Sequence, residues 1–211
     1  MMVDSIKKTN PQSKVIQVTD ISSPEVDQID DCLRFNLNIS QLMKFRFEAY
    51  SRIKLEKNIS NLFIDSDMLI MRPLKNLNIL LKKDIILCKR QINIYAKVNT
   101  NLHNLNMTEY KNKTAIEAWP YLGCFIAMSN KNYFEEMNKM YNKLPEKYKF
   151  WYGDQIILKD YSDSHSELTS CVGELQYACL PTINSQNDVN IFHFKGNNKS
   201  LMIDYYNNFF A

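Results

Sequence analysis

The sequence predicts an α/β fold, a sandwich in which a sheet is covered on both of its faces. Segments with strand character alternate with segments of helical periodicity along the 211 residues. The cores of the expected strands are continuously apolar, which is typical of a sheet that is buried on both sides. Acidic residues directly follow some of these strands, and in α/β sheets ligands bind beyond the carboxyl ends of strands.

The expected elements follow one another in a regular order. The segment 39–55 is predicted to be an amphipathic helix, because Leu42, Phe45 and Ala49 recur at helical spacing. Ser40 stands where it could cap this helix. Strands are expected at 13–20, 61–65, 84–90, 121–129, 175–181 and 190–194, and further helices at 133–144 and 153–162.

The composition is that of a soluble globular protein, with 45% hydrophobic and 23% charged residues. The net charge of +3 is small and its basic residues are scattered, so no nucleic acid partner is expected. The five cysteines form no C-x-x-C pair, which argues against a disulfide framework or a structural zinc site and favours a reducing compartment. We expect one domain spanning residues 1–211.

Features of membrane and secreted proteins are missing from the sequence. No apolar stretch approaches the roughly 20 residues that a membrane-spanning helix needs. The opening segment lacks the apolar region of a signal peptide. The sequence therefore favours a cytoplasmic location without a transmembrane segment, and peripheral contact with a membrane stays open.

A pair of carboxylates, Asp65 and Asp67, flanks Ser66 at the end of the apolar run "NLFI". A turn after the strand could bring both carboxylates to one ligand. Two acidic oxygens suit a hard cation such as Mg²⁺ or Mn²⁺ that also carries phosphate oxygens. A cap or turn before Pro73 is the alternative, and the D-x-D pair alone does not separate the two.

Two further groups of polar residues lie downstream. His193, Gly196 and Lys199 have the spacing H-x-x-G-x-x-K, which offers an imidazole ligand, a close backbone approach and a cation for an anion. A buried histidine followed by a surface turn is the alternative. Asp154 and Gln155 stand at an expected helix start, where a negative charge is favoured, and simple capping by Asp154 is the alternative there.

In this order the three groups resemble the family 8 type of GT-A glycosyltransferases, which includes glycogenin and bacterial galactosyltransferases of lipopolysaccharide. The segment "FRFEAYSRI" is similar to the family's arginine-bearing helix, with Arg46 at the arginine position, and "YLGCFIAMS" resembles one of its strands. The resemblance covers about residues 3–200. It implies a GT-A-like α/β/α sandwich around a mixed, mainly parallel sheet.

The resemblance also implies a set of ligands and their residues. A metal, Mn²⁺ or Mg²⁺, is expected on Asp65, Asp67 and His193, and it would grip the diphosphate of a nucleotide sugar. The matching glycine and lysine of the diphosphate site are Gly196 and Lys199. The implied activity is transfer of a hexose, with retention of anomeric configuration, from a UDP-sugar to a hydroxyl of a glycan or glycolipid.

The remaining implied residues lie on the sugar side of this site. The family's Asp-Gln pair faces the donor sugar, which makes Asp154 and Gln155 the catalytic candidates for stabilising an oxocarbenium-like centre. The helical arginine also approaches the donor, which implies Arg46, and Ser66 completes the donor-binding motif.

The chain also departs from the family pattern. Leu122 stands where the family strand has an asparagine, and Ser200-Leu201 replaces a Pro-Trp pair. Residues 1–20 read as the end of a first helix that runs straight into the second strand. We therefore expect the family's first strand, which forms part of the base pocket, to be missing.

Two alternatives remain from the sequence. A haloacid-dehalogenase-type phosphatase would use Asp65 as its nucleophile, although Leu69 occupies a place where such enzymes usually have Thr or Val. A non-catalytic remnant of a glycosyltransferase would keep the sheet and the acidic pair but lack the base pocket. Binding of a nucleoside diphosphate would separate these possibilities.

Overall fold

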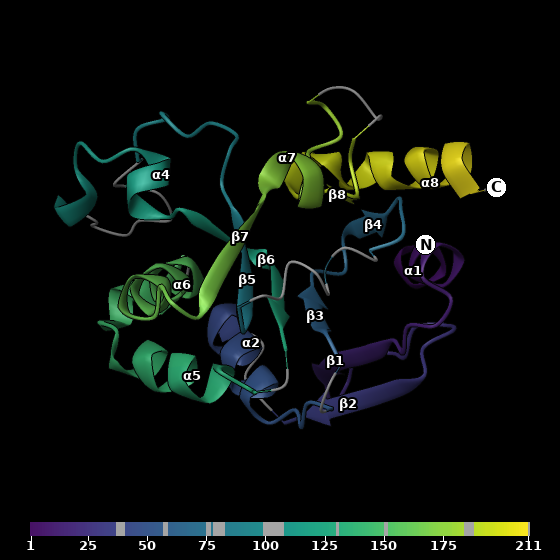
Figure 1. Ribbon diagram of the computed structural model, residues 1–211, viewed down its shortest axis with the longest axis horizontal. Coiled ribbons are helices and arrows are strands. Elements are labelled where there is room, and N and C mark those ends of the chain that lie inside the picture. Colours follow the sequence, from purple (N-terminus) through teal and green to yellow (C-terminus); the bar gives the residue numbers. More distant parts are fainter. Residues whose placement is uncertain are drawn as a thin grey trace.

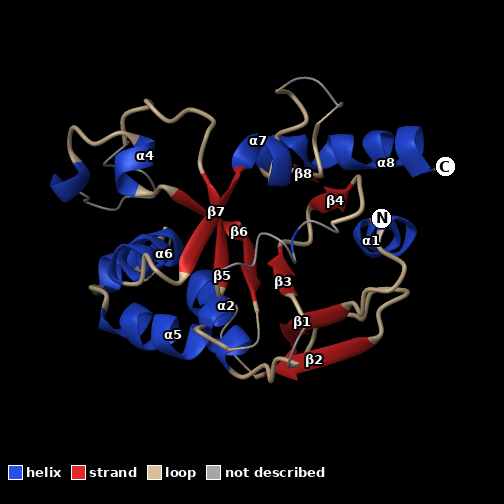
Figure 2. Cartoon of the chain, viewed as in Figure 1, coloured by secondary structure: helices blue, strands red, loops and turns tan. Residues whose placement is uncertain are grey.

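A computed structural model describes residues 1–36, 41–56, 59–74, 77, 83–98, 108–129, 131–149, 152–183 and 188–210. Its strands and helices are arranged in layers around a central sheet (Figures 1 and 2). The predicted cap at Ser40 lies outside the described residues. Within the described residues, no helix combines the length and the apolar character needed to cross a membrane.

Most of the expected elements are present close to their predicted positions. The strands are β1 (Ile16–Asp20), β2 (Asp31–Phe35), β3 (Asn61–Ile64), β4 (Met68–Ile70), β5 (Ile85–Lys89), β6 (Tyr121–Met128), β7 (Thr169–Gly173) and β8 (Ile191–His193). The α-helices are α1 (Met2–Thr9), α2 (Leu42–Ser51), α4 (Ala115–Ala118), α5 (Phe134–Lys143), α6 (Gly153–Ser164), α7 (Glu174–Tyr177) and α8 (Met202–Phe210). Short 3-10 helices are η3 (Thr108–Tyr110), η4 (Glu146–Tyr148) and η5 (Gly196–Leu201).

Among the described residues, the central sheet has four strands in the order β3-β6-β5-β7. Strand β6 is antiparallel to both β3 and β5, whereas β5 and β7 are parallel. The predicted α/β fold around a mixed sheet is confirmed. The expectation that the sheet is mainly parallel is wrong for the described strands, because a continuously apolar strand such as β6 reports burial on both faces and carries no information about direction.

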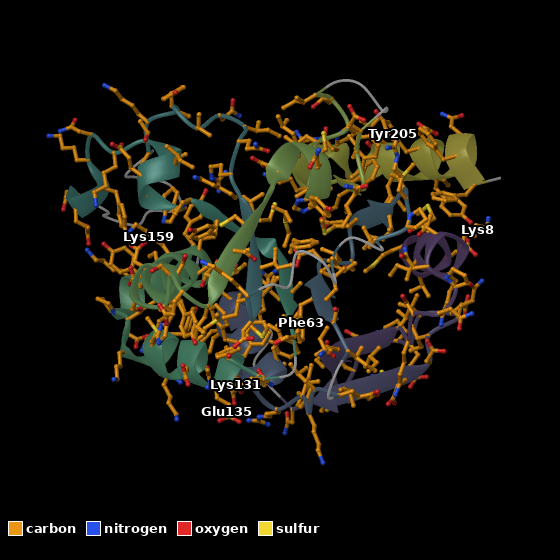
Figure 3. All side chains as sticks on the ribbon, in the orientation of Figure 1. Lys8, Phe63, Lys131, Glu135, Lys159 and Tyr205 are labelled. Carbon is orange, nitrogen blue, oxygen red and sulfur yellow. The ribbon has the colours of Figure 1, made fainter. Side chains whose placement is uncertain are left out.

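One face of the sheet is covered by α2, α5 and α6. Alternate residues of β5 point to opposite faces, so Ile85 and Leu87 join the core under these helices. Phe63 of β3, labelled in Figure 3, is partly buried and packs against this core with its ring centroid 4.8 Å from that of Phe134. The helical layer thus holds α2 and α6 against the same sheet face.

The opposite face is covered by the two-stranded β4-β8 sheet and α7. Ile86 and Cys88 of β5 join the core on this side. Helix α8 packs outside this layer, where Tyr205 lies with its ring 5.1 Å from that of Phe192 (Figure 3). The two ends of the described chain lie side by side (Figure 1), and Lys8 Nζ of α1 donates to the Phe210 carbonyl over 2.6 Å.

The strand expected at 175–181 is wrong. This segment begins with the short helix α7, and Cys179 makes an isolated parallel bridge to β8. The cause is Glu174, whose Oε2 accepts the backbone N–H groups of Gln91 and Ile92, each over 2.8 Å. This buried carboxylate ties the chain to the end of β5, so the apolar residues that follow start a helix instead of extending β7.

Strands β1 and β2 form a separate parallel pair. Within the described residues, neither strand is hydrogen-bonded to β3 as part of the central sheet. Asp20, at the end of β1, accepts hydrogen bonds from Ser22 and Ser23 and so closes a local turn. The expectation that a first strand is missing stays a prediction.

Candidate active site

The D-x-D pair lies in the turn between β3 and β4. Strand β3 ends at Ile64, and Ser66 and Asp67 form the turn before β4 begins. The N–H of Asp65 donates to the Cys124 carbonyl of β6 over 3.2 Å, which keeps Asp65 against the sheet while Ser66 is exposed. Because the chain turns here, the side chains of Asp65 and Asp67 do not follow the alternation between sheet faces that a continuous strand would impose.

Pairing of β4 with β8 brings His193 to this turn. In the antiparallel register Met68 lies opposite His193, and the N–H of Phe194 donates to the Asp67 carbonyl over 2.8 Å. Asp65, Asp67 and His193 each offer a ligand atom, and these atoms all lie within 4.8 Å of one another. The structure thus collects three residues that are far apart in the sequence into one group.

Two basic side chains of this site contact the Asp67 carboxylate. His193 Nε2 lies 3.3 Å from its Oδ1, and Lys199 Nζ lies 3.3 Å from its Oδ2. Burial alone would raise the pKa of Asp67, but the hydrogen bonds and charges of His193 and Lys199 outweigh it and lower the pKa to about 2. Asp67 is therefore an ionised carboxylate at neutral pH.

The donor set of this group fits a divalent cation. Two carboxylates and an imidazole are oxygen and nitrogen ligands of the kind that Mn²⁺ accepts, and carboxylates also suit Mg²⁺. The His193 ring is 6% exposed, and its Nδ1 is buried without a hydrogen-bond partner among the described residues. Packing in β8 therefore holds the ring, with Nε2 on the side of Asp67.

Arg46 connects the D-x-D turn to the start of α6. From α2, its Nη2 donates to Asp65 Oδ1 over 2.7 Å, and its Nη1 donates to Asp154 Oδ2 and to the Gly123 carbonyl, each over 2.8 Å. The side chain of Asp154 is only 4% exposed. Burial raises the pKa of Asp154, and the adjacent Arg46 charge opposes this effect. Burial would lower the pKa of Arg46, but its two carboxylates raise it, so the guanidinium stays charged.

Gly123 makes this close approach possible. A Cβ at this position would lie 2.1 Å from Asp154 Oδ2 and 2.4 Å from Arg46 Nη1. The pairing of β6 with β5 shifts register between Leu87 and Cys88, and Gly123 lies in the stretch of β6 that the shift passes over. Gly123 is not among the residues predicted from the sequence, although an isolated glycine inside a strand, in a chain with four glycines, is a signal of close approach.

Gly123→Ala is expected to displace the Arg46–Asp154 ion pair. The added methyl group has no space, and overpacking of this kind costs about 1–3 kcal/mol of unfolding free energy. Urea unfolding of the variant and of the wild type measures this loss. A Gly123→Ala variant as stable as the wild type would contradict the tight contact.

The Gln155 side chain is held by Arg90, which is also not among the residues predicted from the sequence. Arg90 Nη2 donates to Gln155 Oε1 over 2.8 Å. Arg90 directly follows β5, and polar side chains beyond strand ends are the signal that could have selected it. Gln155 lies in the first turn of α6, next to Asp154.

The predicted site residues fall into three classes according to their contacts in the structure. Six of them form two sets of contacts, one in which Arg46 bonds to Asp65 and Asp154, and one in which Asp67 contacts His193 and Lys199. The two sets adjoin where ligand atoms of Asp65, Asp67 and His193 lie within 4.8 Å of one another. Gln155 adjoins the first set through the backbone of Asp154. Gly196 and Ser66 are exposed. Gly196 has a left-handed φ of 62°, and no atom of the described residues lies within 4 Å of the place where its Cβ would be.

Comparison with known proteins decides the type of fold. No family model and no curated sequence matches the chain. Among the solved structures that it resembles is the apo form of mouse xyloside xylosyltransferase 1, with a TM-score of 0.50 and 14% sequence identity, over 87% of this chain and 84% of the mouse chain. The fold is glycosyltransferase-like. In this glycosyltransferase-like fold, the Asp65–Asp67–His193 group is a set of residues that could bind a metal.

Proposed function

We propose that the protein is a metal-dependent glycosyltransferase. It would move a sugar from a nucleoside-diphosphate sugar, a UDP-sugar in the first instance, to a hydroxyl of a glycan or glycolipid. The observation that carries this proposal is the gathering of Asp65, Asp67 and His193 within 4.8 Å, in a chain whose fold resembles that of a glycosyltransferase.

The diphosphate end of the donor is assigned to the D-x-D turn and η5. A divalent cation, when bound by Asp65, Asp67 and His193, supplies a Lewis acid for the departing diphosphate. Lys199 adds its own ammonium, whose Nζ lies 3.3 Å from Asp67 Oδ2 and whose side chain is 65% exposed. The left-handed φ of Gly196 suits close approach of its backbone to an anion.

The sugar end is assigned to the start of α6. Asp154 accepts from the N–H of Gln155 through Oδ1 and from Arg46 through Oδ2, each over 2.8 Å. Because both of its oxygens are engaged, we assign Asp154 to holding Arg46 and α6 in place. Gln155 is half-buried and is assigned to the sugar. Transfer of a hexose with retention of configuration remains part of the proposal and rests on the resemblance in sequence.

Three UDP-sugars are to be tested as donors. The mouse protein is named for xylosyl transfer to a xyloside. UDP-xylose therefore joins UDP-glucose and UDP-galactose as a donor to be tested, with release of UDP as the measured product.

Glycosyl transfer accounts for more of the site than the phosphatase alternative. Asp65, the nucleophile in that alternative, accepts from Arg46 over 2.7 Å. Phosphatase chemistry at Asp65 would give no role to the contact of His193 with Asp67. The fold likeness to a glycosyltransferase adds independent support.

Binding of Mn²⁺ and UDP tests the proposal directly. Together they are expected to raise the unfolding free energy by about 2.7 kcal/mol at a hundredfold excess over Kd, measured as a rise in Tm. Lys199→Ala is expected to weaken UDP binding about 10-fold or more, because a hydrogen bond to a charged group is worth about 1.5–3 kcal/mol. The variant keeps Asp65, Asp67 and His193, so it should still bind Mn²⁺ in the absence of UDP.

Lys131→Ala is the matched control for Lys199→Ala. The Lys131 side chain is 61% exposed and pairs with Glu136 over 3.6 Å, on the outer side of the helical layer (Figure 3). Its replacement should leave UDP binding unchanged. Absence of any shift with Mn²⁺ and nucleoside diphosphates in the wild type would favour the non-catalytic remnant, and phosphate release without UDP binding would favour the phosphatase.

A further inference from the structure

Arg90 is held at three points beyond the end of β5. Its backbone N–H donates to the Pro120 carbonyl over 2.8 Å, and its Nε donates to the Trp119 carbonyl over 2.9 Å. Its Nη2 donates to Gln155 Oε1 over 2.8 Å. The guanidinium is therefore fixed by the backbone on one side and holds the Gln155 side chain on the other.

The backbone that holds Arg90 is itself rigidly placed. Trp119 is 5% exposed, and its ring stacks on Tyr152 with centroids 4.0 Å apart and planes within 11°. Tyr152 in turn immediately precedes α6, in a left-handed conformation with φ of 60°. This packing ties the Trp119 carbonyl to the start of the helix that carries Gln155.

The contact with Arg90 determines which way the Gln155 amide points. A guanidinium has only donors, so the amide atom that faces it must be the oxygen. The amide NH₂ of Gln155 therefore points away from Arg90, with two N–H groups to donate. Gln155 adjoins Asp154, which Arg46 links to Asp65 of the metal-binding group.

We propose that Arg90 is a positioning residue that holds Gln155 as a hydrogen-bond donor to a hydroxyl of the transferred sugar. The inference rests on the proposed function and extends it. It changes the role expected for Gln155, because N–H donors do not stabilise positive charge at an anomeric carbon, whereas they do recognise hydroxyl oxygens. Arg90 acts through Gln155 and not on the diphosphate.

Calorimetry with matched ligands tests this division of roles. Wild type, Arg90→Met, Gln155→Met and the double variant are titrated in Mn²⁺ with UDP and with the one of UDP-glucose, UDP-galactose and UDP-xylose that the wild type binds most tightly. Arg90→Met is expected to weaken UDP-sugar binding about 10-fold while UDP affinity is unchanged, and the double variant should lose no more than Gln155→Met.

Two further variants separate positioning from structural support. Gln155→Glu keeps an oxygen for Arg90 but removes the NH₂, so it should lose UDP-sugar affinity as Gln155→Met does. Arg34→Met is the control, since Arg34 also donates to two backbone carbonyls but lies on β2. It should leave both affinities unchanged.

Several results would overturn the inference. Equal loss of UDP and UDP-sugar affinity in Arg90→Met would show that Arg90 only supports the fold, and additive losses in the double variant would show that it acts independently of Gln155. Full UDP-sugar affinity in Gln155→Glu would exclude the donor role while leaving the proposed function intact. A wild type that binds UDP but discriminates none of the three sugars would also overturn it, whereas a wild type that binds no UDP would overturn the proposed function as well.

Discussion

Asp67→Ala is expected to abolish the Mn²⁺-dependent binding of UDP. The substitution removes one of three ligands of the metal-binding group and also the partner of His193 and Lys199. Loss of an outer-shell partner alone typically weakens metal affinity 10–100-fold, so we expect a loss of about 100-fold or more here. Isothermal calorimetry with Mn²⁺, and then with UDP in saturating Mn²⁺, measures both effects.

Asp163→Ala serves as the control for Asp67→Ala. Asp163 is 61% exposed and pairs with Lys159 on the surface of α6, so its loss should leave Mn²⁺ affinity unchanged. The fold of Asp67→Ala should persist, because the Phe194 N–H bonds to the backbone carbonyl at position 67 and not to the side chain. Unchanged Mn²⁺ affinity in Asp67→Ala would contradict the metal assignment.

The Asp67 carboxylate also has a predictable effect on stability in acid. Its native pKa of about 2 lies below its usual value of 3.8, so the ionised form is favoured by folding. The resulting stabilisation is present above pH 4 and is lost as the pH falls toward 2. The difference in unfolding free energy between wild type and Asp67→Ala should shrink over this range.

Arg46→Met is expected to cause the largest loss of stability. The guanidinium is 13% exposed and bridges Asp65 and the nearly inaccessible Asp154. Removing one partner of a buried ion pair leaves an uncompensated charge and costs about 3–5 kcal/mol. Urea unfolding monitored by circular dichroism measures the change in unfolding free energy.

Arg52→Met is a matched control near the end of the same helix. Arg52 also donates to a carboxylate, Glu48, but its side chain is 50% exposed, so the loss should be at most about 1 kcal/mol. If Arg46→Met does not fold, Arg46→Lys keeps the charge but cannot reach all three acceptors, and it should show an intermediate loss. Equal small losses in Arg46→Met and Arg52→Met would contradict the buried bridge.

The cost of Arg46→Met should depend on pH with a defined sign. Burial already raises the pKa of Asp154, and Arg46 opposes this shift, so the variant should raise the pKa further. A buried acid with a raised pKa disfavours its charged form, and stability falls as the pH rises above the usual value of 3.8. The difference in unfolding free energy between Arg46→Met and the wild type should therefore become smaller as the pH falls toward 4.

Local patterns in the sequence determined most of the elements and the residues of the metal-binding group. Continuous apolar runs predicted β3, β5 and β6, because a strand that is buried on both faces has apolar residues at successive positions, whichever strands it pairs with. The D-x-D pair and His193 were predicted because carboxylates and an imidazole suit Mn²⁺ and because their order resembles that of a glycosyltransferase family.

The tertiary structure alone decided how the site is held together. The antiparallel direction of β6, the helix at α7 and the register that sets Met68 opposite His193 all depend on partners distant in the chain. The same holds for the hydrogen bonds that Arg46 and Arg90 make across elements. The sequence shows which side chains are able to form hydrogen bonds and ion pairs. Which of them come into contact depends on how the helices and strands pack against one another.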